Sequence, residues 1–535
     1  MHTMKKPILR LLAFFSVVFP VLVTFCSLLS GICHAQSQFQ LAIGGLDRDY
    51  AYSIIRTTDG GYAVAGLTRS FGAGDYDFYI VKLDMGGTFQ WSKSIGGANA
   101  ELQPSIVQTT DGGYAIAGQT RSFGASPWDI YIVKLDGSGT FQWNRTVRGG
   151  GALSAFSIIQ TTDGGYMLVG EGDCYFVKLD PNGALQWTRL SFGTAYSAIQ
   201  ATDGGYAVVG YTSASGAGND DMYIVKVDTG GTPQWNKTVG GTGNEHAYSI
   251  VQTTDGGYAV AGGTDSFGAG GIDMYIVKLD GSGTLQWTRT VGGTGNDVAN
   301  SIIQTTDGGY AVAGYTLFFG APDMYIVKLD GNGTLQWSRA VGGTGGDFAN
   351  SIIQTTDGGY AVAGHTDSFG AGMFDMYIVK LDASGNTCGN SSSPSSISGT
   401  GGTTTSPTPT VITPTPTVTN PTPTTSTGGT VTAICNPVGI QPILNEIPDS
   451  YELDQNFPNP FNPATTISFS LPSKSFVSLK VFDALGREVS VLVSEELSAG
   501  TYTQHWDAAG FASGVYFYCL SAGSFVETKK LVLLR

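Results

Sequence analysis

Short apolar runs of three to six residues recur along residues 39–382, and glycine-rich turns separate them. One stretch is representative: residues 301–305, 310–314, 324–329 and 335–337 are apolar and rich in β-branched or aromatic side chains. Runs this short, bounded by Gly and Asp-Gly, predict strands and tight hairpins rather than helices. Four strands in about 50 residues is the size of one blade of a β-propeller.

The string Thr-Asp-Gly-Gly-Tyr marks this unit and occurs seven times. Its aspartates are separated by 52, 52, 40, 52, 52 and 50 residues. They are Asp59, Asp111, Asp163, Asp203, Asp255, Asp307 and Asp357. Self-similarity at a fixed period indicates a repeat architecture and predicts seven four-stranded units.

The two ends of the repeat region indicate a closed ring rather than a linear solenoid. The seventh unit stops after Asp382 and has no tryptophan strand, whereas Phe39 precedes Gly44-Gly45 at the offset at which Trp91 precedes Gly96-Gly97. We therefore expect residues 39–43 to supply the outer strand of the last blade, which leaves no open sheet edge. The predicted fold is all-β: a seven-bladed propeller over residues 36–388 and a small C-terminal Ig-like sandwich.

The segment 280–287, Asp-Gly-Ser-Gly-Thr-Leu-Gln-Trp, resembles the tryptophan-docking motif of quinoprotein-type propellers, although it is one residue shorter between aspartate and glycine. The resemblance implies a blade-packing role for one aromatic residue in each unit. These are Phe39, Trp91, Trp143, Trp187, Trp235, Trp287 and Trp337. It covers only the blade turns and nothing matches a quinone site, so we expect no cofactor.

A lysine follows the apolar third strand of every unit. These lysines are Lys82, Lys134, Lys178, Lys226, Lys278, Lys328 and Lys380. A buried lysine needs a partner, which would be either the turn aspartates or the series Asp77, Asp129, Asp173, Asp221, Asp273, Asp323 and Asp375. We expect structural pairing rather than a functional basic ring, because the lysine repeats with the fold.

Composition and charge narrow the function. Glycine is abundant, at 77 residues, without a three-residue period, and this excludes collagen. The net charge of -15 disfavours nucleic acid, whose phosphates need a basic footprint. Of the six cysteines, Cys388 and Cys435 flank a low-complexity stretch and would either bridge or stay free. No Cys/His spacing indicates a metal site.

The N-terminal segment is typical of an export signal. Lys5, Lys6 and Arg10 precede an apolar run, and Ala35 offers a small residue for cleavage. The alternative is a membrane anchor, but Pro20 interrupts the run and no basic flank follows it. We expect residues 1–35 to be removed.

After the repeats, residues 389–445 are mostly Ser, Thr, Gly and Pro, and we expect an extended, semi-stiff spacer that holds the propeller away from the next domain. Residues 446–535 contain short strands and turn glycines, a sandwich pattern.

Several motifs in this tail identify a family. They are Asn-Phe-Pro-Asn-Pro-Phe-Asn-Pro at 456–463, Val-Phe-Asp-Ala-Leu-Gly-Arg-Glu-Val at 481–489, Gly-Val-Tyr-Phe-Tyr at 514–518 and the basic close at 529–535. Together they resemble the type A C-terminal sorting domain of the type IX secretion system; a generic sandwich module is the alternative. The resemblance implies a Bacteroidetes-like bacterium, the type IX machinery as a partner, and export across both membranes to the cell surface or the medium. It assigns the sorting signal to Gly514, Tyr516, Lys529, Lys530 and Arg535.

Ligand binding is expected at one rim of the ring, where the longer and more variable loops gather. The candidates there are Arg48, Asp75, Tyr76, Arg121, Trp128, Glu171, His246, Phe318, Phe319, His365 and Phe374. The alternative for each aromatic is that it packs its own loop. The third unit is shorter by eight and four residues in its long loops, which predicts a notch beside Trp128.

Three functions remain open for the ring. A monomeric surface protein that binds glycans or proteins is favoured, because no serine nucleophile motif or asymmetric carboxylate pair stands out from the repeats. A polysaccharide hydrolase or lyase with its site at the propeller mouth is the alternative, and a passive coat protein is the third. No catalytic residue or metal ligand is assigned.

Overall fold

The computed structural model describes most of the chain after residue 37. Described are residues 38–123, 127–148, 152–171, 175–189, 193–317, 320–388, 450–456, 458–462, 464–508, 511–523 and 525–534, with short stretches between 391 and 443. The predicted export signal, Phe318, Phe319 and Arg535 therefore lie outside the described residues.

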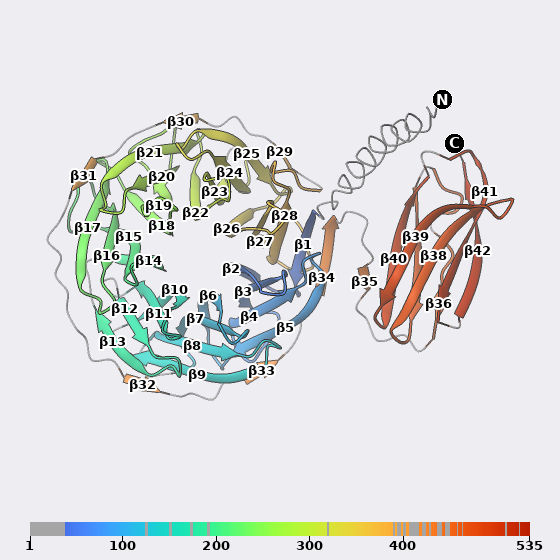
Figure 1. Ribbon diagram of the computed structural model, residues 1–535, viewed down its shortest axis with the longest axis horizontal. Coiled ribbons are helices and arrows are strands. Elements are labelled where there is room, and N and C mark those ends of the chain that lie inside the picture. Colours follow the sequence, from blue (N-terminus) through green and yellow to red (C-terminus); the bar gives the residue numbers. More distant parts are fainter. Residues whose placement is uncertain are drawn as a thin grey trace, which may run out of the picture.

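Residues 39–381 form seven four-stranded antiparallel units arranged as blades around a central axis (Figure 1). The innermost strands are β2 (Asp49–Arg56), β6 (Glu101–Gln108), β10 (Ser154–Gln160), β14 (Thr194–Gln200), β18 (Glu245–Gln252), β22 (Asp297–Gln304) and β26 (Asp347–Gln354). The second strands are β3 (Tyr62–Thr68), β7 (Tyr114–Thr120), β11 (Tyr166–Glu171), β15 (Tyr206–Thr212), β19 (Tyr258–Thr264), β23 (Tyr310–Thr316) and β27 (Tyr360–Thr366).

The third and fourth strands complete each blade outward from the axis. The third strands are β4 (Asp77–Leu83), β8 (Asp129–Leu135), β12 (Tyr175–Leu179), β16 (Asp221–Val227), β20 (Asp273–Leu279), β24 (Asp323–Leu329) and β28 (Asp375–Leu381). The fourth strands are β5 (Phe89–Gly96), β9 (Phe141–Arg148), β13 (Leu185–Arg189), β17 (Pro233–Gly240), β21 (Leu285–Gly292), β25 (Leu335–Val341) and, for the seventh blade, β1 (Phe39–Gly44).

The predicted ring closure is confirmed. Strand β1 pairs antiparallel with β28, with Phe39 opposite Lys380 and Ile43 opposite Met376. The last blade therefore combines both ends of the repeat region, and the fold is the seven-bladed propeller that the repeats predict. Middle strands such as β20 are buried along their whole length because neighbouring blades cover both of their faces.

Aromatic rings connect adjacent blades. Trp287 packs edge-to-face on Tyr310 of the next blade at 5.6 Å between ring centroids, and Phe39 packs on Tyr62 in the same way at 6.1 Å. A side-chain carbon at Gly333 would crowd Trp287, so glycine lets the turn of the next blade approach the indole. Four other fourth-strand tryptophans make the same contact with Tyr114, Tyr166, Tyr258 and Tyr360, and Trp187 packs in a tilted geometry on Tyr206.

The buried lysines pair with the turn aspartates. Lys278 is nearly buried, and its Nζ lies 2.9 Å from Asp255 Oδ2; it also donates to the Leu279 carbonyl and to Gln286 Oε1. The same ion pair recurs in all seven blades, at 2.6 to 2.9 Å. Each lysine thus lies at the tight-turn rim with a carboxylate beside it, which supports a structural role.

The Ser/Thr/Pro-rich segment is not the free spacer that its composition suggested. Its short strands pair with the fourth strands of six blades and follow the outer circumference of the ring (Figure 1). They are β29 (Ser391–Ser392) on β25, β30 (Ile397–Gly399) on β21, β31 (Thr403–Thr405) on β17, β32 (Thr417–Thr419) on β9, β33 (Thr424–Ser426) on β5 and β34 (Thr430–Cys435) on β1.

We call these six strands the belt. The spacer expectation was wrong because a segment that cannot form a core can still bond to an open sheet edge, and the outer strand of each blade presents one. The paired stretches contain no proline, which would remove a donor from the ladder. Cys388, just before the belt, is disulfide-bonded, and Cys435 lies opposite Gln40, whose side chain donates to the Cys388 carbonyl.

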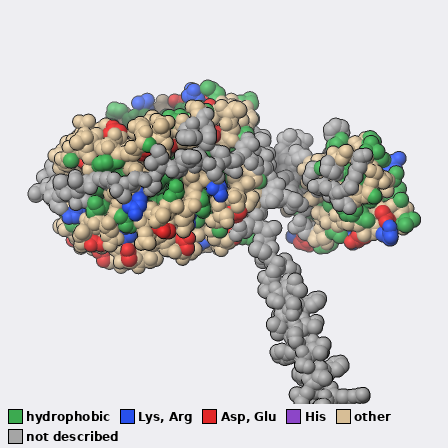
Figure 2. Space-filling model, turned by 90° about the horizontal axis from the view of Figure 1, so that it is seen from above, with side chains coloured by type: hydrophobic (Ala, Val, Ile, Leu, Met, Phe, Trp, Pro, Cys, Tyr) green, Lys and Arg blue, Asp and Glu red, His purple; other side chains and the backbone are tan. Residues whose placement is uncertain are grey.

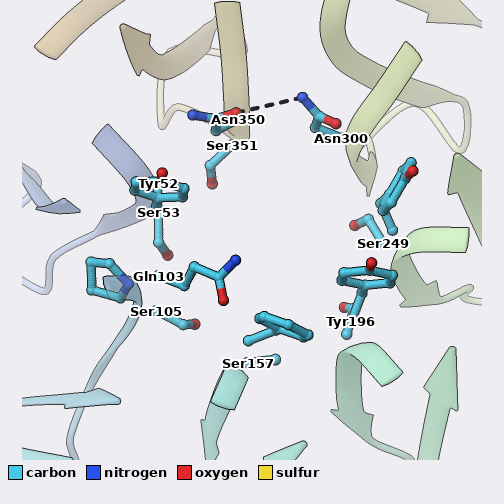
Figure 3. A pocket seen from close by; sticks show the side chains of 14 residues that line it. Tyr52, Ser53, Gln103, Ser105, Ser157, Tyr196, Ser249, Asn300, Asn350 and Ser351 are labelled. Atoms are coloured by element: carbon cyan, nitrogen blue, oxygen red, sulfur yellow. Dashed lines mark hydrogen bonds between the residues drawn. The ribbon is translucent and has the colours of Figure 1, made fainter. Parts of the chain in front are cut away.

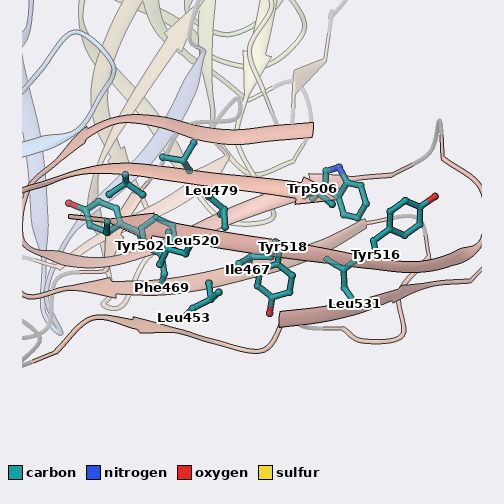
Figure 4. Close-up of a cluster of buried hydrophobic side chains, with 14 of the residues drawn as sticks. Leu453, Ile467, Phe469, Leu479, Tyr502, Trp506, Tyr516, Tyr518, Leu520 and Leu531 are labelled. Carbon is teal, nitrogen blue, oxygen red and sulfur yellow. The ribbon is translucent and has the colours of Figure 1, made fainter. Parts of the chain in front are cut away.

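The tail domain is a sandwich of two four-stranded sheets around its own core (Figure 4). One sheet holds β35 (Gln441–Ile443), β40 (Gly500–Asp507), β37 (Ala464–Leu471) and β36 (Glu452–Leu453). The other holds β39 (Glu488–Leu497), β38 (Ser475–Asp483), β41 (Gly514–Ala522) and β42 (Phe525–Leu533). Alternating burial along β37 shows one face turned to the core.

Candidate functional site

The longer loops lie at the rim opposite the tight turns, because each innermost strand starts at the long-loop rim and ends at the Asp-Gly-Gly turn. Charged side chains are few on the side of the ring that Figure 2 shows. The side chains that differ between blades lie at the long-loop rim and in the central channel, and such variable positions on a rigid scaffold often carry function.

Five of the sequence candidates gather where the seventh blade meets the first. His365 packs against Tyr50 at 4.9 Å and Phe374 at 5.5 Å between ring centroids, and Tyr50 lies 6.2 Å from Tyr76. Arg48 is hydrogen-bonded to Tyr76, an interaction that raises the pKa of its guanidinium, and Asp75 pairs with Arg69 at 3.1 Å. Burial lowers the pKa of His365 to about 4, so this ring is neutral and part of an aromatic cluster.

Other candidates stand apart from that cluster. Arg121 lies over the Trp128 ring at 4.2 Å, a cation–π contact, and Glu171 is exposed at the end of β11. The loops next to this pair, at 124–126 and 149–151, lie outside the described residues, so the predicted notch stays a prediction.

His246 belongs to a hydrogen-bonded chain at the channel mouth. Its Nε2 lies 3.1 Å from Asp220 Oδ2 and its Nδ1 lies 3.2 Å from the Tyr248 hydroxyl. The ring also packs on Tyr211 at 4.2 Å. Burial raises the pKa of Tyr248 to about 12, so the phenol keeps its proton and acts as a hydrogen-bonding group.

The ring encloses a cavity of about 280 Å³ on its axis, lined by the innermost strands (Figure 3). One layer of the wall repeats around the ring: every blade has a serine there, and in six blades it accepts a backbone N–H of the next blade, as Ser249 does from Ile302 at 3.1 Å. The other recorded acceptors of this kind are Ser53, Ser105, Ser157, Ser301 and Ser351. This layer is structural, because it follows the repeat.

The neighbouring layer, one residue before each serine, does not follow the repeat. Three blades place tyrosines there and one a phenylalanine, whereas two place asparagines and one a proline. In blade order these are Tyr52, Pro104, Phe156, Tyr196, Tyr248, Asn300 and Asn350. Phe156 stacks on Tyr196 at 5.0 Å, and Asn300 donates to the Ala349 carbonyl at 2.8 Å. Aromatic faces thus occupy part of the wall and amides another part.

Gln103 is the largest departure from the repeat. The other six blades have alanine at this position, at 51, 155, 195, 247, 299 and 349. Gln103 has a φ of 57°, the single positive value at a non-glycine residue among the described residues, and its Oε1 is buried with no hydrogen-bond partner. Its amide points into the channel (Figure 3). A strained residue with an unused polar atom is typical of a functional position.

Sequence reasoning missed Gln103, Asp220, Tyr248 and the channel aromatics, although one indication of Gln103 was available. Aligning the seven units by their serine shows Gln-Pro where every other unit has Ala followed by one residue. Among the described residues, no group of three or more His, Cys, Asp or Glu side chains is arranged to hold a metal ion. The fold and this lining together define a propeller with an asymmetric, uncharged axial cavity.

The tail carries the family evidence. Residues 455–534 match the family model of the secretion system C-terminal sorting domain, so this domain is a type IX sorting domain and the protein is exported to the cell surface or secreted. Gly514 opens β41, the Tyr516 hydroxyl donates to the Ala512 carbonyl at 2.8 Å, and Lys529 lies 3.4 Å from Glu527. The Lys530 carbonyl accepts from Gln455.

Solved structures resemble the ring at low identity. A Bacteroides caccae protein of unknown function is 12% identical, covers 47% of this chain and 93% of its own, and has a TM-score of 0.31. The Neurospora crassa Pan2 WD40 domain is 10% identical over 63% of this chain and 97% of its own, with a TM-score of 0.39. An endo-1,5-alpha-L-arabinanase from Thermotoga petrophila is 11% identical over 63% and 99%, with a TM-score of 0.25.

No curated protein matches the chain. Within the described residues no helix has the length and apolar character needed to cross a membrane.

Proposed function

We propose that the exported propeller is a monomeric glycan-binding protein that receives a sugar residue in the axial cavity, through the mouth at its long-loop rim. One observation carries this proposal: the channel layer formed by Tyr52, Phe156, Tyr196, Tyr248 and the amide of Gln103 departs from the repeat, while the serine layer beside it does not. Side chains that the fold needs recur in every blade, whereas recognition of a single ligand requires side chains that differ from blade to blade.

The chemistry of the wall favours a neutral, hydroxyl-rich ligand. Aromatic faces pack against the C–H faces of sugar rings, and amides exchange hydrogen bonds with hydroxyl groups. The lining contains no charged side chain. A cavity of about 280 Å³ is just below the usual size of ligand pockets, roughly 300–1,000 Å³. We therefore expect it to hold one or two sugar rings.

The Gln103 Oε1 atom supplies specificity. A buried acceptor without a partner costs on the order of 1–3 kcal/mol, and a rotation of the Gln103 amide that brings this oxygen to a ligand hydroxyl would recover that energy. An analogue that lacks that hydroxyl would leave the acceptor unpaired again. The rim candidates Arg48, Tyr76, Arg121 and Trp128 lie at the same rim and would contact the remainder of a longer chain.

The test is binding of the purified mature protein to an array of neutral and acidic oligosaccharides, followed by calorimetry on the best binder. Gln103→Ala and Tyr196→Ala should each weaken binding at least tenfold. Met85→Ala, at an exposed residue of the opposite rim, is the matched control and should bind normally. Equal affinity of the wild type and the three variants would exclude the channel as the glycan-binding site. A preference for acidic glycans would contradict a ligand matched to an uncharged wall.

A polysaccharide hydrolase or lyase is the second candidate, favoured by the Asp220–His246–Tyr248 chain at the mouth. A histidine oriented by a carboxylate and bonded to a phenol is a plausible proton-transfer unit. Release of new reducing ends or unsaturated products from the bound glycan, abolished in His246→Ala, would establish it. If the glycan stayed intact after prolonged incubation, catalysis would be excluded and binding would remain as the proposed function.

A further inference from the structure

The hydrogen-bonded chain at the channel mouth ends on a residue of the cavity wall. Asp220 lies just before β16, and His246 and Tyr248 lie two positions apart on β18, on the same face of the strand. Tyr248 also lines the axial cavity. A change of charge at His246 therefore reaches the proposed sugar site through the Tyr248 hydroxyl.

Asp220 fixes which ring nitrogen of His246 carries the hydrogen. An ionised carboxylate only accepts hydrogen bonds, so Nε2, which lies 3.1 Å from Asp220 Oδ2, is the donor. In the neutral ring Nδ1 then has a lone pair and no hydrogen. The Tyr248 hydroxyl, 3.2 Å from Nδ1, therefore donates its proton to the ring and leaves only oxygen lone pairs for a ligand.

Protonation of His246 reverses this hydrogen bond. In the imidazolium both ring nitrogens are donors, so Nδ1 donates to the Tyr248 oxygen and the phenol proton becomes available to a ligand. Burial raises the pKa of Tyr248 to about 12, so the phenol keeps that proton in either charge state of the histidine. The further titratable groups beside Tyr248 are the tyrosines Tyr196, Tyr211 and Tyr315. One residue of the wall thus changes from an acceptor to a donor.

The groups around His246 favour its protonated form. Asp220 supplies a negative charge at 3.1 Å, and the centroid of the Tyr211 ring lies 4.2 Å from that of the imidazole. Aromatic faces attract cations. No Lys or Arg of the described residues forms an ion pair with Asp220. The other acidic neighbours, Glu245 and Asp221, are buried and accept backbone N–H groups.

The chain contains a second histidine at the mouth for comparison. His365 lies between Phe348, at 4.8 Å between ring centroids, and Tyr50, at 4.9 Å. Burial alone lowers its pKa to about 4. Histidine ordinarily changes its charge between about pH 5 and pH 8, so His365 stays neutral over this range. The contact with a carboxylate distinguishes His246 from it.

We propose that His246 makes the axial site pH-sensitive by setting the hydrogen-bond polarity of Tyr248. This inference rests on the proposed sugar site. The amides of Asn300 and Asn350 already donate to backbone carbonyls, so release of the Tyr248 proton adds a free donor to the wall. A sugar hydroxyl whose oxygen accepts that proton gains one hydrogen bond, which corresponds to roughly a three- to tenfold gain in affinity at acidic pH.

The experiment is calorimetry of the intact mature protein with cellotetraose, maltotetraose, xylotetraose and mannotetraose, each at about pH 8 and about pH 5. A tetrasaccharide that binds should bind roughly three- to tenfold more tightly at the lower pH and take up a fraction of a proton at intermediate pH. His246→Gln and Tyr248→Phe should each bind equally at both pH values, whereas His365→Gln, the matched control, should keep the pH dependence. Equal affinity of the wild type at both pH values would overturn the inference and leave the channel as a binding site.

Nuclear magnetic resonance of the ¹⁵N-labelled protein tests the His246–Tyr248 hydrogen bond without a sugar. At about pH 8 the His246 ring should carry its hydrogen on Nε2, and Asp220→Asn should lower the pH at which the ring takes up a second proton. A hydrogen on Nδ1 at that pH, or a ring that stays neutral at about pH 5, would contradict the assignment. If the ring behaves as expected but no tetrasaccharide binds at either pH, the proposed function, and not the change in Tyr248, is contradicted.

Discussion

The two rims of the ring hold buried charge in opposite ways. At the tight-turn rim every blade pairs a lysine with an aspartate, as Lys278 does with Asp255 at 2.9 Å. At the long-loop rim carboxylates meet carboxylates, as Asp273 meets Asp297, and one interface replaces the pair altogether. The tight-turn rim repeats one ion pair in all seven blades, whereas the arrangement of buried carboxylates at the long-loop rim varies between blades.

Strong acid should destabilise the ring through the tight-turn rim. Burial alone would raise the pKa of Asp59, but the hydrogen bonds from Lys82 and Thr57 outweigh it and lower the pKa to about 2; Asp111, Asp163, Asp255 and Asp307 behave alike. A depressed folded-state pKa contributes stability that is present above about pH 4 and is lost as the pH falls towards 2. Denaturant midpoints measured from pH 5 to pH 2 should fall steeply, and a flat profile would contradict the pairing.

Breaking one tight-turn pair should be the largest single-residue effect. Asp255→Ala leaves the buried Lys278 ammonium without its carboxylate, and we expect a loss of about 2–4 kcal/mol in the free energy of unfolding, since the aspartate is half exposed. Adding Lys278→Met should recover part of this loss, because the orphan charge is then gone. Urea unfolding of both variants measures the difference, and glycan binding in the channel should be unaffected.

Gln103→Gly separates stability from recognition. Glycine tolerates the positive φ and removes the unpaired buried acceptor, so the free energy of unfolding should rise by about 0.5–1 kcal/mol while ligand affinity falls. Ala247→Gly, at the matching position of the fifth blade, is the control and should be destabilising. If Gln103→Gly lost stability, the strain argument would be wrong.

The smallest effect is expected at the Arg121–Trp128 contact. Arg121 is exposed and makes a cation–π contact of 4.2 Å, so Arg121→Ala should cost about 0.5–1 kcal/mol or less in stability. Arg121→Lys should retain part of that energy. A larger loss in ligand affinity than in stability would show that the pair belongs to the binding surface.

The repeats allowed most of the fold to be predicted, including the role of β1, because the seven units can be aligned with one another and the missing strand of the last unit is then visible. The sorting tail was equally accessible through its ordered motifs. The belt could not be predicted, because a composition rich in Ser, Thr and Pro indicates only that the segment forms no core of its own. It does not show that open sheet edges lie nearby. Asp220 could not be connected with His246 either, since 26 positions separate them and only the packing of two blades brings them to 3.1 Å.

The belt gives the ring a mechanical property. The chain leaves the seventh blade after β28, passes the outer strands in reverse order and returns to the seventh blade as β34 before it enters the tail domain. A load on an anchored tail would therefore peel β34 from β1 first and then each short strand in turn, a few hydrogen bonds at a time. With the Cys388 disulfide reduced and the belt fully unwound, about 45 residues would extend to a tether of roughly 150 Å while the blades stay folded.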